Sequence, residues 1–199
     1  MLPRKQYLDK LIQKKDNGRV KIITGLRRSG KSVLLFGLYR DHLLREGIAP
    51  EQIIGLALDT FANAKYRNPI ELDQYVRERI TDPNKRYYVF IDEIQFVSEI
   101  QNPWVDDPKA KITFTDVVLG LMQIRNADVY VTGSNSKMLS TDVLTQFRDR
   151  GDEIRVYPLS FAEFFDAYEE DKRGAWQDYY TYGGMPVVTT LKTHEEKSR

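Results

Sequence analysis

The sequence has no cysteine, no long apolar run and almost no net charge. Without cysteine the chain forms no disulfides and offers no thiolate for catalysis or metal binding, which suits a reducing compartment. No stretch is apolar enough to span a bilayer, and residues 1–5 lack the apolar core of a signal peptide. The 30 basic and 29 acidic residues leave a net charge of +1, so no global attraction to nucleic acid or membrane is expected. These absences predict a soluble, cytoplasmic protein.

A glycine-rich stretch at residues 25–32 (GLRRSGKS) is the strongest signal in the chain. It fits the Walker A or P-loop pattern, Gly-x-x-x-x-Gly-Lys-Ser, between a β-branched apolar run and an apolar helical run. Gly25 and Gly30 let the backbone approach a phosphate, Lys31 supplies charge for the β- and γ-phosphates, and Ser32 supplies a hydroxyl for Mg²⁺. A glycine turn that only caps a helix is the structural alternative. The predicted nucleotide contacts are Gly25, Leu26, Arg27, Arg28, Ser29, Gly30, Lys31, Ser32 and Val33.

Residues 87–93 (YYVFIDE) form the second informative stretch. Its continuous apolar run is typical of a strand buried on both faces of a sheet, and two carboxylates end it. Behind a P-loop this order favours a Walker B motif over a strand that happens to end in acidic residues. Asp92 is predicted to hold Mg²⁺ through water, and Glu93 to polarise an attacking water as the catalytic carboxylate.

Three further positions are candidates for the catalytic site. A predicted strand at residues 128–132 is followed by Asn135, which, with Ser134 beside it, suits a sensor of the γ-phosphate; an asparagine turn is the alternative. Arg148 and Arg150 precede a predicted strand at residues 153–157. Either arginine could reach the γ-phosphate of a neighbouring subunit in a homo-oligomer, or could lie solvated at a helix end.

Other residues have two interpretations each. Asp59 ends a predicted strand at the edge where open α/β sheets bind ligands, or it is a solvated turn aspartate. Tyr7 lies on a predicted amphipathic helix and either packs on the sheet or contacts an adenine base. Trp104, in a polar insertion at residues 95–112, is a partner contact or an anchor to the domain's own surface.

Several motifs together resemble those of a large group of archaeal and bacterial AAA-type ATPases. Residues 24–32 (TGLRRSGKS) match the Walker A loop of that group, and residues 90–95 (FIDEIQ) match its Walker B motif. Residues 132–136 (TGSNS) match its sensor strand end. Residues 157–164 (YPLSFAEF) and 182–186 (YGGMP) resemble its P-L-S-F-x-E-[FY] and G-G-x-P motifs.

This resemblance implies an α/β three-layer P-loop NTPase fold with five parallel strands in the order 5-1-4-3-2, and ATP or ADP with Mg²⁺ as the ligands. No guanine-reading Asn-Lys-x-Asp motif is present, since residues 84–87 are NKRY. We expect an ATPase core at residues 1–157 and the start of a helical lid at 158–199, truncated before a C-terminal domain found in relatives. The chain departs from the group at Asp149, where relatives often have glycine, and in its longer insertion.

The predicted function is Mg²⁺-dependent ATP binding and hydrolysis coupled to conformational change of an attached domain or partner. An ATP-binding switch with negligible hydrolysis of its own is the alternative from a different class. A small-molecule kinase is a third hypothesis, against which Asp92, Glu93 and Asn135 favour water as the acceptor. Nucleic-acid translocation stays open, although the balanced charge gives it no support.

Overall fold

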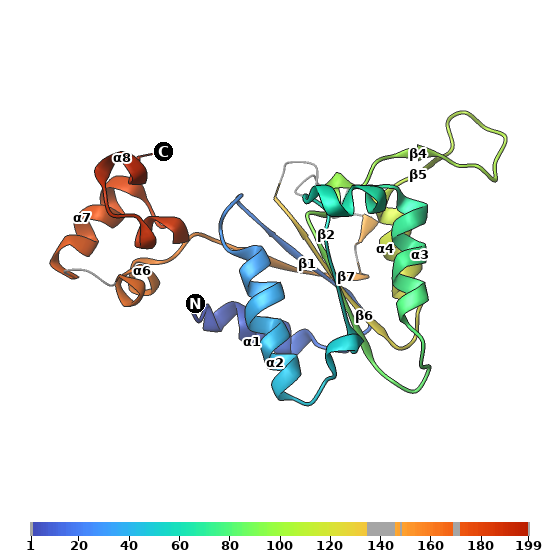
Figure 1. Cartoon of the computed structure of the whole chain (residues 1–199), viewed down its shortest axis with the longest axis horizontal. Coiled ribbons are helices and arrows are strands. Elements are labelled where there is room, and N and C mark those ends of the chain that lie inside the picture. The colour runs from blue at the N-terminus through green and yellow to red at the C-terminus, as the bar shows by residue number, and fades with distance from the viewer. Residues whose placement is uncertain (1, 135–145, 148, 169–171, 199) are drawn as a thin grey trace.

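A parallel sheet forms the centre of the computed structural model, which describes residues 2–134, 146–147, 149–168 and 172–198. Its strands lie in the order β2-β3-β6-β1-β7 (Figure 1), which is the predicted order 5-1-4-3-2 read from the other edge. The P-loop NTPase fold class is therefore confirmed. The five strands are β1 (Val20–Gly25), β2 (Ile53–Ala57), β3 (Tyr87–Asp92), β6 (Ala127–Gly133) and β7 (Gly151–Val156).

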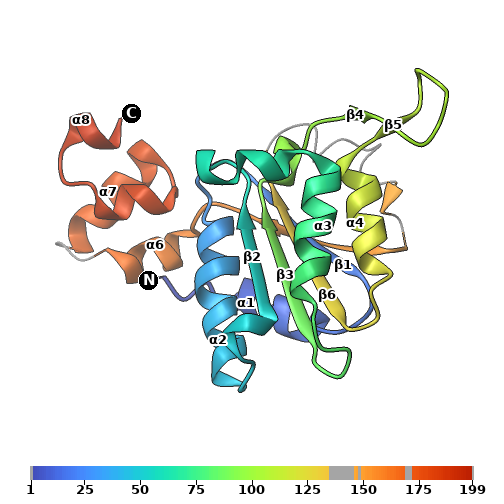
Figure 2. The same cartoon turned by 45° about the vertical axis from the view of Figure 1, so that its right-hand side comes forward.

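Helices cover both faces of this sheet, and each face has its own hydrophobic cluster (Figure 2). Leu11 and Leu35 belong to the cluster on one face, and Val76 and Val118 to the cluster on the other. The first face is covered by α1 (Lys5–Lys14), a π-helical segment (Val33–Tyr39) and α2 (Arg40–Arg45), and the second by α3 (Pro69–Arg79) and α4 (Phe114–Met122). The 3₁₀ turns in the core are η2 (Pro50–Gln52), η3 (Phe61–Arg67) and η4 (Ile94–Phe96).

The central strands β1, β3 and β6 are buried along their whole lengths, as their apolar runs predict. A few residues of these strands are polar rather than apolar, and Lys21 and Asp128 pair with each other inside the core. Lys21 on β1 is fully buried, and its ammonium lies 2.5 Å from a carboxylate oxygen of Asp128 on β6. Burial lowers the pKa of Lys21, while the neighbouring Asp128 opposes that shift. The pair ties two adjacent strands together at the end of the sheet away from the P-loop.

Helix starts follow the capping chemistry of the sequence. The Asn68 side chain accepts a hydrogen bond from the backbone N–H of Ile70 at 2.9 Å, and Pro69 occupies the first turn of α3, where proline is favoured. Ser160 and Glu163 form a capping box at the start of α6 (Phe161–Ala167). These caps fix where the chain enters each helix, and so set the lengths of the preceding loops.

The C-terminal segment, residues 158–168 and 172–198, packs around a small hydrophobic cluster of its own beside the sheet (Figure 1). It contains α6, α7 (Lys172–Tyr182), the 3₁₀ turn η5 (Pro186–Thr190) and α8 (His194–Lys197). The Leu159 N–H donates to the Gly184 carbonyl at 2.6 Å, which joins the start of the segment to the loop after α7. A side chain at Gly184 would meet the Leu159 carbonyl oxygen at 2.2 Å, so only glycine fits there.

A hairpin of β4 (Ile100–Gln101) and β5 (Lys111–Ile112) projects from the body of the protein (Figures 1 and 2). It forms the predicted polar insertion, and its Trp104 is 74% exposed, so this side chain is not a buried anchor. The sequence pattern favours a helix over residues 138–150, most of which lie outside the described residues. No helix in the described part of the chain is long and apolar enough to cross a membrane.

Candidate functional site

The P-loop begins where β1 ends against the backbone of β7. Gly25 has φ +143°, and a Cβ at this position would lie 2.1 Å from the Val156 carbonyl oxygen. Arg28 and Gly30 also have positive φ angles, 65° and 96°. Backbone that alternates in this way turns successive N–H groups toward one concavity, which is an anion nest. A non-glycine residue such as Arg28 in the left-handed region is strained by about 1 kcal/mol or more, and such strain clusters at functional sites.

The ammonium of Lys31 is positioned to bind a phosphate. Its side chain is 3% exposed, and its ammonium donates to the carbonyl oxygens of Gly25 at 3.2 Å and Leu26 at 3.0 Å. Burial lowers the pKa of Lys31, whereas the nearby carboxylates of Glu93 and Asp92 oppose the shift. Because its hydrogen-bond partners are neutral carbonyls of the loop itself, a phosphate can replace them at little electrostatic cost.

Asp92 and Ser32, the two predicted Mg²⁺ ligands, lie together. Asp92 is 5% exposed, and burial raises the pKa of its carboxyl while hydrogen bonds from Thr132 and Ser32 oppose that rise. A hydroxyl and a carboxylate side by side are oxygen donors of the kind that Mg²⁺ binds together with phosphates and water. The buried Ser29 hydroxyl has no partner among the described atoms, which leaves one P-loop donor free for a ligand. The donor set therefore fits a Mg²⁺–nucleotide complex.

Thr132 on β6 contacts both Walker B residues, Asp92 through its carboxylate and Glu93 through its backbone. Its hydroxyl donates to Asp92, and it accepts a hydrogen bond from the backbone N–H of Glu93 at 3.0 Å. The parallel register pairs Ile91 with Val131, so the next residues of β3 and β6 are neighbours. The motifs in the sequence did not predict this role, although a threonine within the apolar run of β6 is a recognisable signal.

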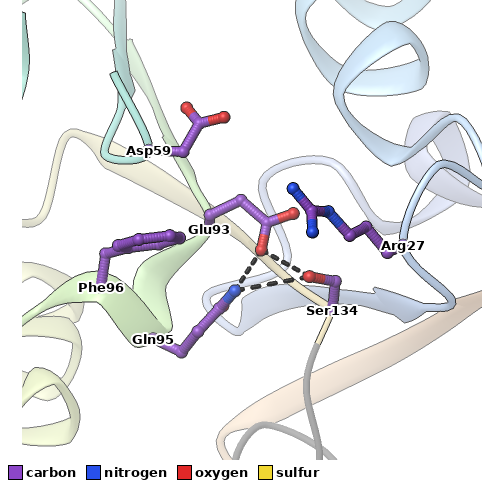
Figure 3. Close-up of a pocket in the computed structure, with 6 residues that line it drawn as sticks. All are labelled: Arg27, Asp59, Glu93, Gln95, Phe96 and Ser134. Atoms are coloured by element: carbon purple, nitrogen blue, oxygen red, sulfur yellow. Dashed lines mark hydrogen bonds between the residues drawn. The ribbon is translucent and has the colours of Figure 1, made fainter. Parts of the chain in front are cut away.

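Glu93 lies in a pocket of about 400 Å³ at the carboxyl edge of the sheet (Figure 3). Glu93 itself has φ 53°, because the chain turns sharply out of β3 at this point. One of its carboxylate oxygens, Oε2, accepts hydrogen bonds from the Ser134 hydroxyl at 2.7 Å and from the Gln95 amide. This region, named the Glu93 pocket below, is lined by Arg27, Asp59, Glu93, Gln95, Phe96 and Ser134.

The lining of the pocket bears on several residues singled out in the sequence. Asp59 lines it together with Glu93, which supports the ligand-site interpretation over the turn interpretation. Arg27 lines it from the P-loop. Gln95 is a second residue that sequence reasoning missed, although it stands two positions after Glu93 in the FIDEIQ motif. Ser134, the alternative sensor, is brought into contact with Glu93.

Four other residues were singled out in the sequence: Asn135, Arg148, Arg150 and Tyr7. Asn135 and Arg148 fall outside the described residues. Arg150 is exposed and directly precedes β7, whose first residue, Gly151, pairs with Val20 at the start of β1. Arg150 therefore lies at the amino-terminal end of the strands, opposite to the P-loop. Tyr7 is 4% exposed, and its hydroxyl accepts from the Tyr157 N–H at 3.2 Å, so it packs in the core rather than lining a pocket.

A second pocket, of about 570 Å³, lies between the P-loop and the C-terminal segment. Its core side includes Gly30 and Val33, and Pro186 and Val187 come from η5. Arg4 also lines it; its side chain is 6% exposed, and its guanidinium donates to the Tyr157 carbonyl at 2.6 Å. We call it the Arg4 pocket, and its wall is more apolar than that of the Glu93 pocket.

Residues 17–165 match the AAA domain family, so this chain belongs to that family of P-loop ATPases. An uncharacterized protein of Haemophilus influenzae is 37% identical over 193 residues, which cover 94% of this chain and 44% of that protein. The uncharacterized protein MJ1544 of Methanocaldococcus jannaschii is 26% identical over 189 residues, covering 87% and 37%. The chain thus spans less than half the length of these relatives.

Solved structures show the same fold. The Walker-type ATPase PABY2304 of Pyrococcus abyssi superposes with a TM-score of 0.63 at 16% identity, covering 95% of this chain and 66% of that one. The Hsp104 of the S. cerevisiae Hsp104:casein complex gives a TM-score of 0.59 at 15% identity, covering 94% and 35%. At these identities the likeness is one of fold alone.

Proposed function

We propose that this chain binds Mg-ATP in its P-loop and hydrolyses it, and that the cycle changes the conformation of the C-terminal segment and of whatever is attached to it. The observation that carries the proposal is the convergence of four side chains at one edge of the sheet. The ammonium of Lys31 is close enough to the carboxylates of Asp92 and Glu93 for their charges to raise its pKa. The Ser32 side chain forms a hydrogen bond with the Asp92 carboxylate. A loop cation, two metal ligands and a catalytic carboxylate are what phosphoryl transfer to water requires.

Each residue has a distinct role in this proposal. The P-loop N–H groups and Lys31 would hold the β- and γ-phosphates, and Arg27 would add positive charge from the wall of the Glu93 pocket. Ser32 and Asp92 would hold Mg²⁺, which supplies positive charge to the phosphate oxygens. Glu93 would orient the attacking water and accept its proton.

The Arg4 pocket suits the nucleoside part of the same ligand. It adjoins the P-loop at Ser29 and Gly30, and its apolar wall comes from both the core and the C-terminal segment. A Cβ on Gly30 would lie 3.9 Å from the Pro186 ring, so the loop and η5 are in close contact. A ligand bound there would touch both parts, which gives nucleotide exchange a direct route to the C-terminal segment.

Steady-state ATP hydrolysis, measured against protein concentration, tests the proposal. Glu93→Gln should keep Mg-ATP binding and remove nearly all turnover, whereas Glu51→Gln, an exposed control on η2, should change neither. Equal amounts of ADP and free phosphate would identify water as the acceptor and exclude a kinase. Tight Mg-ATP binding with no turnover at any concentration would favour the switch hypothesis, and no binding at all would refute the ATPase.

Turnover that rises faster than linearly with concentration would show a site completed between subunits. For that case we propose that Arg150 contacts the γ-phosphate bound in a neighbouring subunit. Arg150 is exposed and does not line the Glu93 pocket of its own chain. Mixing Arg150→Ala with Glu93→Gln chains should then restore part of the activity, because some mixed interfaces hold both intact residues. Mixtures as inactive as their components would contradict the trans role.

A further inference from the structure

Among the described residues, hydrogen bonds hold Glu93 by one of its two carboxylate oxygens. The Gln95 amide and the Ser134 hydroxyl both donate to Oε2, and they lie 3.5 Å from each other. Figure 3 shows the other oxygen pointing into the pocket, toward the side where Arg27 lies. A glutamate fastened at one oxygen has lost most of its rotamer freedom, while its second oxygen stays available.

The backbone around Gln95 fixes it for this contact. Ile94 is fully buried, and the Phe96 N–H donates to the Glu93 carbonyl at 3.0 Å, which closes the tight turn η4. The Arg67 guanidinium lies 5.0 Å from the centre of the Phe96 ring and packs over it. Both neighbours of Gln95 are therefore anchored, and its side chain returns toward Glu93.

The Gln95 amide is oriented to donate to the Glu93 carboxylate, although this leaves its own oxygen without a partner among the described atoms. Its nitrogen faces Glu93, and its oxygen is buried with no partner among the described atoms. A buried acceptor without a partner is unfavourable, and folded proteins rarely keep one without a reason. An amide whose role was only to fill space or brace the turn would be expected to satisfy both of its ends.

We propose that Gln95 is a positioning residue for ATP hydrolysis, with Ser134 as its second donor. It fixes Oε2 of Glu93 so that the free oxygen faces the place of the attacking water. This inference rests on the proposed ATPase function. Gln95 itself contacts neither nucleotide nor metal in this assignment, and it acts through Glu93 alone.

The test is ATP turnover of the full chain with Gln95→Leu, which has similar volume but no donor. We expect kcat to fall about ten- to a hundredfold, the effect of one hydrogen bond to a charged group, while KM for ATP changes by less than about threefold. Gln74→Leu is the matched control, because the Gln74 amide donates to the Glu78 carboxylate at 2.7 Å on the exposed face of α3. That variant should keep wild-type kinetics.

Three further variants separate positioning from a structural effect. Ser134→Ala should lower kcat, and Ser134→Thr, which keeps the hydroxyl, should restore it. In a Glu93→Gln background, Gln95→Leu should cause no further fall in the residual turnover, since Gln95 acts through the lost carboxylate. If Gln95→Leu does not fold, the isosteric Gln95→Glu replaces it; a second carboxylate there should lower kcat at least as much.

The outcomes are distinguishable. A wild-type chain that binds Mg-ATP without turnover overturns the ATPase function and this role with it. A wild-type chain with turnover, and a Gln95→Leu variant within about twofold of it, overturns only the role of Gln95. A variant faster than wild type overturns it as well, because Gln95 would then restrain Glu93 rather than position it. A loss confined to KM would also refute the inference.

Discussion

Replacing Thr132 with valine should weaken both the folded state and Mg-ATP binding. The threonine hydroxyl donates to Asp92 and accepts from the Glu93 N–H at 3.0 Å, so one atom connects two site residues to β6. Thr132 is fully buried, and valine has nearly the same shape. The substitution therefore removes hydrogen bonds without creating a cavity.

The expected magnitude follows from these two bonds. Losing a donor to a buried carboxylate costs about 1.5–3 kcal/mol, and leaving the Glu93 N–H unpaired costs about 1–3 kcal/mol. Glu93 is only half-buried, so water can recover part of the second term. We expect a loss of about 2–4 kcal/mol in unfolding free energy, or a fall in Tm of about 5–15 °C for a chain of this size.

Urea denaturation without nucleotide measures the stability, and titration calorimetry measures ATP affinity with and without Mg²⁺. Thr115→Val is the control, since Thr115 is also buried but lies on α4, away from the site. Only Thr132→Val should weaken binding selectively in the presence of Mg²⁺. A Thr132→Val variant within about 0.5 kcal/mol of wild type, with unchanged Mg-ATP affinity, would refute the reasoning.

Three other changes have definite expected outcomes. Gly25→Ala should abolish ATP binding, because its Cβ would lie 2.1 Å from a carbonyl oxygen of β7; equilibrium binding of a fluorescent ATP analogue measures this. Lys21→Met should destabilise the fold by about 3–5 kcal/mol in urea denaturation, because it leaves Asp128 charged and buried without its cation. A third prediction concerns acid. Burial alone would raise the pKa of Asp178, but hydrogen bonds, notably from Lys197, lower it below 3.8 overall, so their stabilisation is present above about pH 4 and lost as pH falls through the folded pKa. The difference in Tm between wild type and Lys197→Met should therefore shrink below pH 4, and a difference independent of pH would contradict this.

Local sequence patterns predicted most of the elements because each is specified over a few residues. Each of three short patterns predicts the structure of its own segment: the P-loop glycines, the apolar run ending at Asp92 and the capping box at Ser160. The same locality limits what they predict about contacts. Gln95 stood two residues from Glu93 in a motif that was recognised, yet its orientation depends on the buried turn around it.

The sequence by itself determined the order of the elements, the family and the residue types that meet a phosphate, because those depend on short motifs and on the burial of whole strands. Only the tertiary structure decided which side chains meet across the sheet. The register of β3 against β6 brings Thr132 to Asp92, 40 positions away in the chain, and the packing of η5 on the P-loop joins Pro186 to the wall shared with Arg4. Such contacts depend on strand register and on the packing of distant segments, which no local pattern specifies.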